Sequence, residues 1–408
     1  MGSIGRRDEK AAIQQSLDQL NTAADTYLNL PSDADSNDAK YELYMKASRL
    51  SQTVRGPVET VFEQFENMAR LGSIRTLLEA GVFHTMPAGS ESISAEELSE
   101  KTGMDKKLIV RLMRALTPLG PFQETGFEQY AHTPFSELYA NQQIAAVYKT
   151  MADDFCAPML RNYEFLQHND WKNAITLRSN PFTWVHECEG MTMFEYMSKS
   201  PARMARFSDA MIPMASTQVS TGIYPFAEKL RGLESPDRAT IVDVGGGRGH
   251  MLRWIREGVP ELKGQFILQD RANVIADNGE EIRAHGIEPM VHDFFTPQPV
   301  KGALVYYMRQ IVHDWPDEPE CRRILENLAA VMDPEKSRVL ISEYVVPEIG
   351  TSMHPAWMDQ TIMTFGGIER TENDFAHILD ISGLELVKTW RTPGVPVGVV
   401  EAQLKPRK

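Results

Sequence analysis

A glycine-rich turn between a predicted strand and a predicted helix carries the strongest chemical signal in the sequence. The run from Thr240 to Val244 is mostly apolar and β-branched, as in a buried strand. Gly245, Gly247 and Gly249 follow at alternate positions before helical spacing resumes. Glycines at such a junction allow bare backbone to approach a ligand. We interpret this turn, Gly246 included, as a cofactor-binding loop, with a tight turn without a ligand as the alternative.

The glycine spacing and two acids indicate the kind of cofactor. G-x-G-x-G differs from the G-x-G-x-x-G that places a dinucleotide pyrophosphate at a helix N-terminus. Asp243 lies in the preceding strand, and Asp270 ends the next one at about the interval where an acid binds ribose hydroxyls. The pattern favours an adenosine-type cofactor without a diphosphate, and S-adenosylmethionine is the obvious candidate.

Polar and aromatic residues follow the next predicted strands as well. They are Asp293 and Phe294 after the third strand, Arg309 and His313 after the fourth, Glu343 at the end of the fifth, and Glu369 in the loop before the last helix. An acid followed by an aromatic ring suits an adenine and its exocyclic amine. Because ligands bind beyond the carboxyl ends of strands in open α/β sheets, we expect these side chains to line one site.

Strands alternate with helices from residue 240 onward, which predicts an α/β fold with a doubly wound, Rossmann-like and mostly parallel sheet. The expected strands are 240–244, 265–270, 288–292, 303–308, 339–345, 385–390 and 396–404, and the expected helices are 274–284, 321–331 and 372–381. We expect this catalytic domain to span 239–408, after a boundary near Ser235-Pro236.

A mainly helical region precedes that domain. Residues 1–55 are expected to form a helical arm, with one amphipathic helix over 11–28 and a second ending near Val54. The apolar stripe of this arm has nothing of its own to bury against. We expect it to pack on a partner subunit, with packing on the same chain as the alternative.

Residues 56–140 have the outline of a winged-helix unit. Ser94 and Glu97 form a capping box, Asp105 can cap a helix over 106–119, and residues 125–133 resemble a hairpin. A winged helix invites a DNA-binding interpretation, but the formal charge of the chain is −14. Nucleic-acid binding needs a basic surface, so a dimerisation role is favoured and no nucleic-acid partner is expected.

The region 141–238 is rich in methionine and aromatic residues, which adapt to flat apolar ligands. We single out Phe155, Met159 and Trp184, together with Met363 further along the chain, as substrate-pocket residues. At helical spacing each of them could instead be ordinary core.

Size and composition place further bounds on the protein. A chain of 408 residues with 42% hydrophobic and 24% charged residues suggests two or three globular domains. Its three isolated cysteines suit a reducing compartment, and no apolar run reaches membrane-spanning length. We therefore expect a cytoplasmic protein without a membrane partner. No ligand cluster for a metal is evident.

Over nearly its whole length the sequence resembles the small-molecule O-methyltransferases of the plant caffeate and fungal polyketide type. The resemblance lies in the strand and turn over 242–249, the triplet His313-Asp314-Trp315, and the segment 366–370. Arg309 stands where plant relatives usually have lysine, which makes the sequence more similar to the fungal members. The resemblance implies a winged-helix dimerisation domain, a homodimer and a Rossmann-like catalytic domain.

The family resemblance also implies roles for the site residues. It implies that S-adenosylmethionine is held by Gly245, Gly246, Gly247, Asp270, Asp293, Phe294 and Arg309. It further implies that His313 is a general base with Glu343 and Glu369 flanking its ring. No metal is implied, because the methyl donor is already activated.

The implied chemistry is in-line methyl transfer to an oxygen that must also lose its proton. The pKa of a phenol (about 10) exceeds that of a histidine (about 6.5) by roughly 3.5 units, so the proton transfer costs about 5 kcal/mol. Proximity and the adjacent sulfonium charge can offset this cost. An aliphatic alcohol would be several pKa steps worse. The expected acceptor is therefore a phenolic or enolic hydroxyl of a small aromatic or polyketide-type metabolite.

Two alternatives stay open. Some fungal relatives keep the cofactor but rearrange or cyclise the substrate without methyl transfer; these tend to lose the histidine or its acids, whereas His313, Glu343 and Glu369 are all present here. The remote alternative is a winged-helix DNA-binding regulator.

Overall fold

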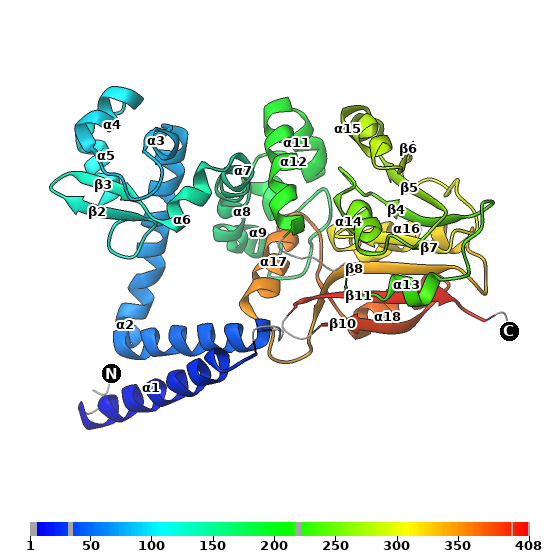
Figure 1. Cartoon of the computed structure of the whole chain (residues 1–408), viewed down its shortest axis with the longest axis horizontal. Helices are drawn as coiled ribbons and strands as arrows, with labels where there is room; N and C mark the ends of the chain where they lie inside the picture. The colour runs from blue at the N-terminus through cyan, green and yellow to red at the C-terminus, as the bar shows by residue number, and fades with distance from the viewer. Residues whose placement is uncertain (1–5, 32–35, 217–221, 393–394, 407–408) are drawn as a thin grey trace. The chain divides into compact units, whose positions relative to one another are not determined.

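The computed structural model describes residues 6–31, 36–216, 222–392 and 395–406 (Figure 1). The chain forms two compact units. Unit 1 comprises residues 1–153 and 205–213, and unit 2 comprises residues 154–204 and 214–408.

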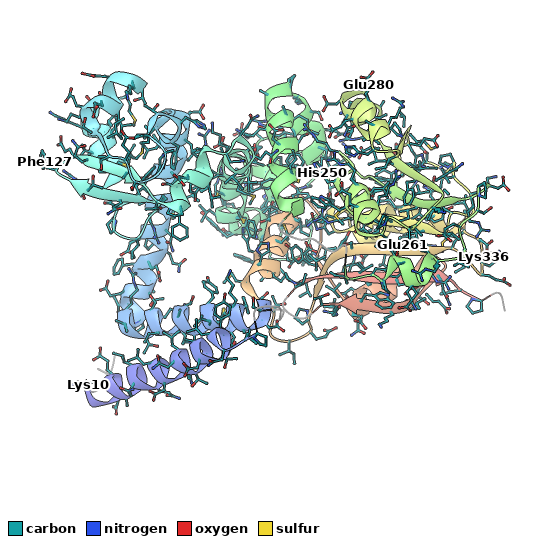
Figure 2. The ribbon with its side chains drawn as sticks, in the orientation of Figure 1. Lys10, Phe127, His250, Glu261, Glu280 and Lys336 are labelled. Carbon is teal, nitrogen blue, oxygen red and sulfur yellow. The ribbon has the colours of Figure 1, made fainter. Side chains whose placement is uncertain are left out.

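Unit 1 is a helical arm followed by a small winged-helix fold. Its helices are α1 (Arg6–Leu28), α2 (Asn37–Glu79), α3 (Val82–Thr85), α4 (Ala95–Thr102), α5 (Lys106–Met113), α6 (Pro134–Glu137) and α7 (Gln142–Thr150). Strands β1 (Ile93–Ser94), β2 (Phe122–Gly126) and β3 (Gln129–His132) form an antiparallel sheet in the order β1-β3-β2. The side chain of Phe127 projects from the turn between β2 and β3 (Figure 2).

Local signals set several of these boundaries. The capping box of Ser94 and Glu97 opens α4, and Asp105 caps α5 by accepting from the Leu108 N–H. Helix α5 ends at Met113, earlier than the predicted Leu119, and the predicted stretch contained Pro118, which cannot donate to a helix. The predicted end of the arm helix near Val54 is confirmed, because Gly56 has a non-helical φ of 78° and ψ of 171° before Pro57. A second helical stretch follows this kink and runs to Glu79 under the same label α2.

Unit 2 is built on one mixed sheet. The strands are β4 (Ala239–Val244), β5 (Gln265–Asp270), β6 (Glu288–Val291), β7 (Val305–Arg309), β8 (Arg338–Val346), β9 (Arg370–Thr371), β10 (Leu384–Arg391) and β11 (Val397–Leu404). Their order is β10-β11-β8-β7-β4-β5-β6, with β9 beside β8. The pairs from β8 to β6 are parallel, and β11 pairs antiparallel with both β8 and β10.

Helices cover both faces of this sheet, as the alternation of buried side chains requires. Val242 and Tyr306 pack with α16 (Arg322–Ala329) and α18 (Glu372–Ile381) on one face. Ile241 and Tyr307 pack on the other face with α13 (Phe226–Leu230), α14 (His250–Gly258) and α15 (Ala272–Ala284) (Figure 1). The predicted doubly wound α/β fold is therefore confirmed.

The remaining helices of unit 2 precede or follow the sheet. They are α8 (Cys156–Leu160), α9 (Asn162–His168), α10 (Pro181–Val185), α11 (Met193–Ser198) and α17 (Met353–Met363); α12 (Pro201–Ser216) contributes to both units. No helix among the described residues is both long enough and apolar enough to cross a membrane.

Candidate active site

The glycine turn lies at the carboxyl end of β4 and opens α14. Gly245 and Gly247 have φ values of 75° and 58°, which side-chain-bearing residues rarely adopt. The Gly247 N–H donates to Asp270 Oδ2 at 2.8 Å, so the acid at the end of β5 lies directly against the turn. A Cβ added at Gly247 would meet open space, whereas one added at Gly246 would lie 2.5 Å from Asp243 Oδ2.

The turn is bordered by buried acids. Burial and repulsion by Asp270 raise the pKa of Asp243 to about 7, against the attraction of Arg309. Burial also raises the pKa of Asp270, against the N–H groups of Arg271 and Gly247. Asp243 Oδ2 has no hydrogen-bond partner among the described residues. An orphaned carboxylate oxygen beside an open glycine cradle fits a positively charged adenosine cofactor such as S-adenosylmethionine.

The predicted aromatic partner reaches the same turn. Phe294 Cε1 lies 3.5 Å from where a Cβ of Gly245 would stand, and the Phe294 ring centroid is 5.9 Å from that of Trp315. Asp293 accepts a hydrogen bond from the Phe295 N–H at 3.0 Å, which fixes the chain just ahead of the ring. The structure therefore brings Asp270 and Phe294 to the glycine turn at the carboxyl end of β4.

His313 follows β7 on a short turn and is buried in unit 2. Its Nδ1 lies 2.8 Å from Glu369 Oε1, and the Glu369 side chain is fully buried. A carboxylate can only accept, so Nδ1 carries the proton and Nε2 is left as the basic nitrogen. Asp314 Oδ1 lies 3.5 Å from that Nε2. The ring is thus oriented by one acid and has a second acid beside its basic edge.

Glu343 holds the turn rather than the ring. Its Oε1 accepts from the backbone N–H groups of Ile311, Val312 and His313 at 3.1, 2.6 and 3.2 Å. Three donors on one carboxylate oxygen fix the backbone that carries the imidazole. The second oxygens of Glu343 and Glu369 are buried without a partner among the described residues.

These acids dominate the electrostatics of the histidine. Burial alone lowers the pKa of His313, but the charges of Glu369 and Asp314 outweigh it and raise the pKa to about 10. Burial raises the pKa of Glu343 to about 7 and that of Asp314 to about 6, opposed in both cases by the attraction of His313. The cluster therefore favours an imidazolium, and a second positive charge nearby would oppose it.

The predicted substrate residues occupy the helical part of unit 2. The Phe155 ring lies 5.8 Å from that of Phe365, just beyond the end of α17, the helix that ends with Met363. Thr361 of α17 donates to the sulfur of Met159 at 3.8 Å. Through these two contacts Phe155, which directly precedes α8, and Met159 of α8 pack against α17 and the residues that follow it.

Trp184 lies on α10, and its contacts are with a different helix. Its ring packs against His168 of α9 at 4.8 Å, and its indole N–H donates to Glu164 at 3.4 Å. The structure therefore groups Phe155, Met159 and the end of α17, while Trp184 contacts α9.

Sequence reasoning did not single out three residues that complete the site. Asp314 was read only as part of a motif, although its position next to His313 could have suggested it. Asp359 of α17 accepts from the Glu369 N–H at 3.0 Å, and Arg370 is fully buried next to Glu369. Nothing in the local sequence marks either of these as buried.

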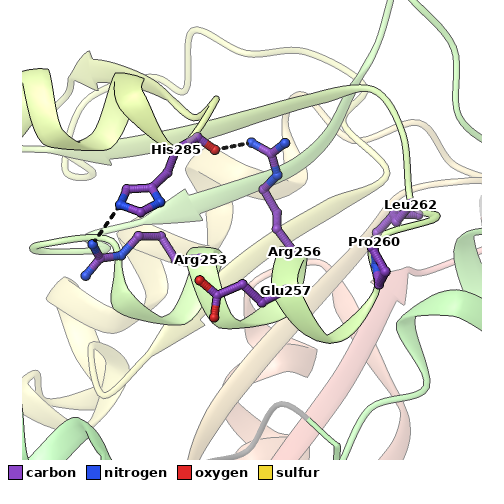
Figure 3. A pocket seen from close by; sticks show the side chains of 6 residues that line it. All are labelled: Arg253, Arg256, Glu257, Pro260, Leu262 and His285. Carbon is purple, nitrogen blue, oxygen red and sulfur yellow. Dashed lines mark hydrogen bonds between the residues drawn. The ribbon is translucent and has the colours of Figure 1, made fainter.

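A separate surface pocket of about 270 Å³ contains none of the predicted site residues. It is lined by Arg253, Arg256, Glu257, Pro260, Leu262 and His285 (Figure 3). Its two arginines are already engaged, since Arg253 pairs with Glu281 at 2.8 Å and Arg256 donates to the His285 carbonyl at 2.6 Å. Among the described residues, no cluster of three or more His, Cys, Asp or Glu is arranged to hold a metal ion.

Comparison with known proteins identifies the family. Residues 168–385 match the O-methyltransferase domain, and residues 63–142 match the O-methyltransferase dimerisation domain. The chain is 38% identical to the O-methyltransferase afvC of Aspergillus flavus over 404 residues, which covers 97% of each chain. The chain belongs to the O-methyltransferase family.

Solved structures agree with this assignment. The enzyme is similar to OxaC in complex with SAH and oxaline, with 46% identity, a TM-score of 0.91 and coverage of 97% of this chain and 100% of that one. It is also similar to LepI in complex with SAM, with 25% identity, a TM-score of 0.84 and coverage of 96% and 100%. The enzyme is therefore a methyltransferase that depends on S-adenosylmethionine.

Proposed function

We propose that this O-methyltransferase acts on a phenolic or enolic hydroxyl of a small aromatic or polyketide-type secondary metabolite, with His313 as the general base. The observation that carries the proposal is the buried contact of 2.8 Å between His313 Nδ1 and Glu369 Oε1. That contact holds the Nδ1 proton against Glu369, so in the neutral ring the basic nitrogen is Nε2, as removal of a hydroxyl proton requires.

The cofactor supplies an electrophilic methyl group when it is bound. His313 Nε2 accepts the proton of the acceptor hydroxyl, and Glu369 stabilises the imidazolium that forms. Because the acids raise the pKa of His313 to about 10, its basicity approaches that of a phenol with a pKa of about 10. In the free enzyme this favours a protonated ring at neutral pH. A positive charge held beside the ring when the cofactor is bound would lower the pKa of His313 and so favour the neutral base.

We further propose that Gly245, Gly246, Gly247, Asp270, Asp293, Phe294 and Arg309 hold the cofactor. Asp270 suits the ribose hydroxyls, and the ring of Phe294 suits the adenine. Phe155, Met159, Trp184 and Met363 are proposed to bind the acceptor through apolar contacts. No metal is proposed, since the leaving group of the donor is already positively charged.

We propose a homodimer formed through unit 1, with no nucleic-acid or membrane partner. The dimerisation domain match supports it, as do apolar side chains of α2 that are exposed in the single chain, including Phe62 (54%) and Phe65 (60%). Sedimentation of a Phe62→Glu/Phe65→Glu variant should give a monomer. Phe127→Glu, on the β2–β3 turn, should stay dimeric. A dimer in both variants would refute this interface. The low cysteine content, three in 408 residues, fits the proposed cytoplasmic location, which cell fractionation would test.

One other function has support, a non-methylating rearrangement. A solved structure described as "A Pericyclic Reaction enzyme" is similar to this chain, with 25% identity and a TM-score of 0.84. The presence of His313, Glu343 and Glu369 in one buried cluster supports methylation instead.

Labelled S-adenosylmethionine separates these functions. Wild type and His313→Ala are incubated with a panel of hydroxylated aromatic polyketides and with meleagrin, a ligand of OxaC. Transfer of label that His313→Ala abolishes supports the proposal. Conversion of substrate without label transfer supports the rearrangement, and undiminished transfer by His313→Ala rejects His313 as the base. Retardation of DNA in a gel, without either reaction, would instead indicate a winged-helix DNA-binding regulator.

A further inference from the structure

Arg370 is a fully buried charged side chain that takes no part in the chemistry described so far. Arg370 is 0% exposed and follows Glu369 directly in the chain. A guanidinium is always charged and offers five donors, so burying one requires several well-placed acceptors. The acceptors of Arg370 therefore show which part of the molecule it organises.

Those acceptors lie on the turn that carries His313. Nη1 donates to the Val312 carbonyl at 3.0 Å, and Nη2 donates to the Trp315 carbonyl at 2.8 Å. Nε and Nη2 both donate to Asp317 Oδ1, at 2.9 and 2.7 Å. Val312 and Trp315 flank His313 and Asp314, so one planar group fixes the turn on both sides of the imidazole.

The residues before Arg370 contact the same turn. The Ile368 N–H donates to the His313 carbonyl at 2.8 Å, and a Cβ added at Gly367 would overlap that carbonyl oxygen. Glu369 binds the His313 ring. Residues 367–370 thus hold both the backbone and the side chain of the histidine, and Arg370 joins this segment to the turn.

We propose that Arg370 is the positioning residue for His313. Its guanidinium holds the turn from Val312 to Asp317 against Glu369, and so keeps the imidazole oriented by that acid. This inference rests on His313 being the general base. A buried arginine that only satisfied core carbonyls would affect stability without changing the titration of His313, which distinguishes the two roles.

The charged groups around His313 give the sign of the expected pH effect. Glu369 faces the ring from the segment before β9 and Asp314 from its own turn, while Glu343, within β8, binds the His313 N–H. Asp359 on α17 acts through the Glu369 backbone. If the turn moves away from Glu369, the largest favourable interaction of the imidazolium weakens. The pKa of His313 then falls, and the acid limb of the rate profile moves to lower pH.

Arg370→Lys tests the inference because lysine keeps the charge but cannot bridge two carbonyls and a carboxylate. Asp317→Asn is the second variant, on a partly exposed partner (39%), and it decides the question if Arg370→Lys fails to fold. The matched control is Arg238→Lys, a substitution away from this turn. The Arg238 guanidinium donates a hydrogen bond of 3.0 Å to Asp333. All are compared by melting temperature, by S-adenosylmethionine affinity, by kcat and KM against pH with a turned-over acceptor, and by NMR titration of labelled histidine.

Arg370→Lys should lower kcat by about 10- to 100-fold, and Asp317→Asn by a smaller factor, because small displacements of a catalytic group cost about that much. The acid limb and the NMR titration of His313 should both move to lower pH, while cofactor Kd changes by less than about threefold. A titration unchanged from wild type, or effects equal to those of Arg238→Lys, would overturn the inference. An active His313→Ala variant would instead refute the proposed base, independently of Arg370.

Discussion

Replacing Glu369 with glutamine tests the central contact of the site. The Glu369 side chain is fully buried, and its Oε1 lies 2.8 Å from His313 Nδ1. Glutamine has nearly the same shape and can still accept this hydrogen bond through its carbonyl oxygen. The substitution therefore removes the negative charge while keeping the orientation of the ring.

The expected loss follows from the strength of that bond. Hydrogen bonds to charged groups contribute about 1.5–3 kcal/mol and neutral ones about 0.5–1.5 kcal/mol, so the exchange costs about 1–2 kcal/mol for the imidazolium. At about 1.4 kcal/mol per tenfold change, kcat should fall by about 5- to 30-fold. If the amide instead presents its N–H to Nδ1, the proton moves to Nε2 and the loss should reach about 10⁴-fold. In the first case the pKa of His313 falls, because Glu369 is its largest favourable charge.

The assay is the initial rate of label transfer from S-adenosylmethionine, measured from about pH 5.5 to about pH 10. For Glu369→Gln with the ring orientation kept, the acid limb should lie at lower pH than in wild type. Calorimetry should give nearly unchanged cofactor affinity. Glu281→Gln is the control, since Glu281 makes an exposed ion pair with Arg253 at 2.8 Å. A Glu369→Gln enzyme with wild-type kcat and an unmoved acid limb would refute the assigned role of this acid.

Three further predictions concern the cofactor turn and the fit of the segment before β9. Gly367→Ala places a Cβ against the His313 carbonyl and 3.3 Å from Asp314 Cα, so kcat should fall by about 10- to 100-fold. Gly258→Ala is the control, because its added Cβ would meet no neighbouring atom within 4 Å, and it should retain activity in the same assay. Asp270→Asn removes the charged acceptor beside Gly247 and should weaken cofactor binding in calorimetry by about 10- to 100-fold; unchanged affinity would contradict that role. The folded pKa of Asp243 (about 7) exceeds its ordinary value of 3.8, so its contribution to stability is complete below about pH 4 and is lost as the pH rises through 7. The change in unfolding free energy that Asp243→Asn causes in the apo-protein should therefore be more stabilising at pH 8 than at pH 4, by roughly 2–4 kcal/mol. Equal shifts of the denaturant midpoint at both pH values would contradict this.

The sequence alone determined the α/β fold and the edge of the sheet where the chemistry lies. Alternating apolar runs predicted β4, β5, β7, β8, β10 and β11 to within about two residues of their observed ends. The Ser94 capping box and the Asp105 cap marked the starts of α4 and α5. These features are local, since they depend on residues within a few positions of one another. The glycine turn and Asp270 were also readable, because each lies at a strand end.

Tertiary structure decided which groups act on the histidine and how. Glu343 and Glu369 were both expected beside the ring, yet Glu343 binds the backbone of the turn, since its position within β8 brings its carboxylate to the N–H groups of residues 311–313. Asp359 and Arg370 reach the site across 46 and 57 residues of sequence from His313, a separation at which no local pattern reports burial. A buried charge is placed by the fold around it, and its partners become apparent only when distant segments meet.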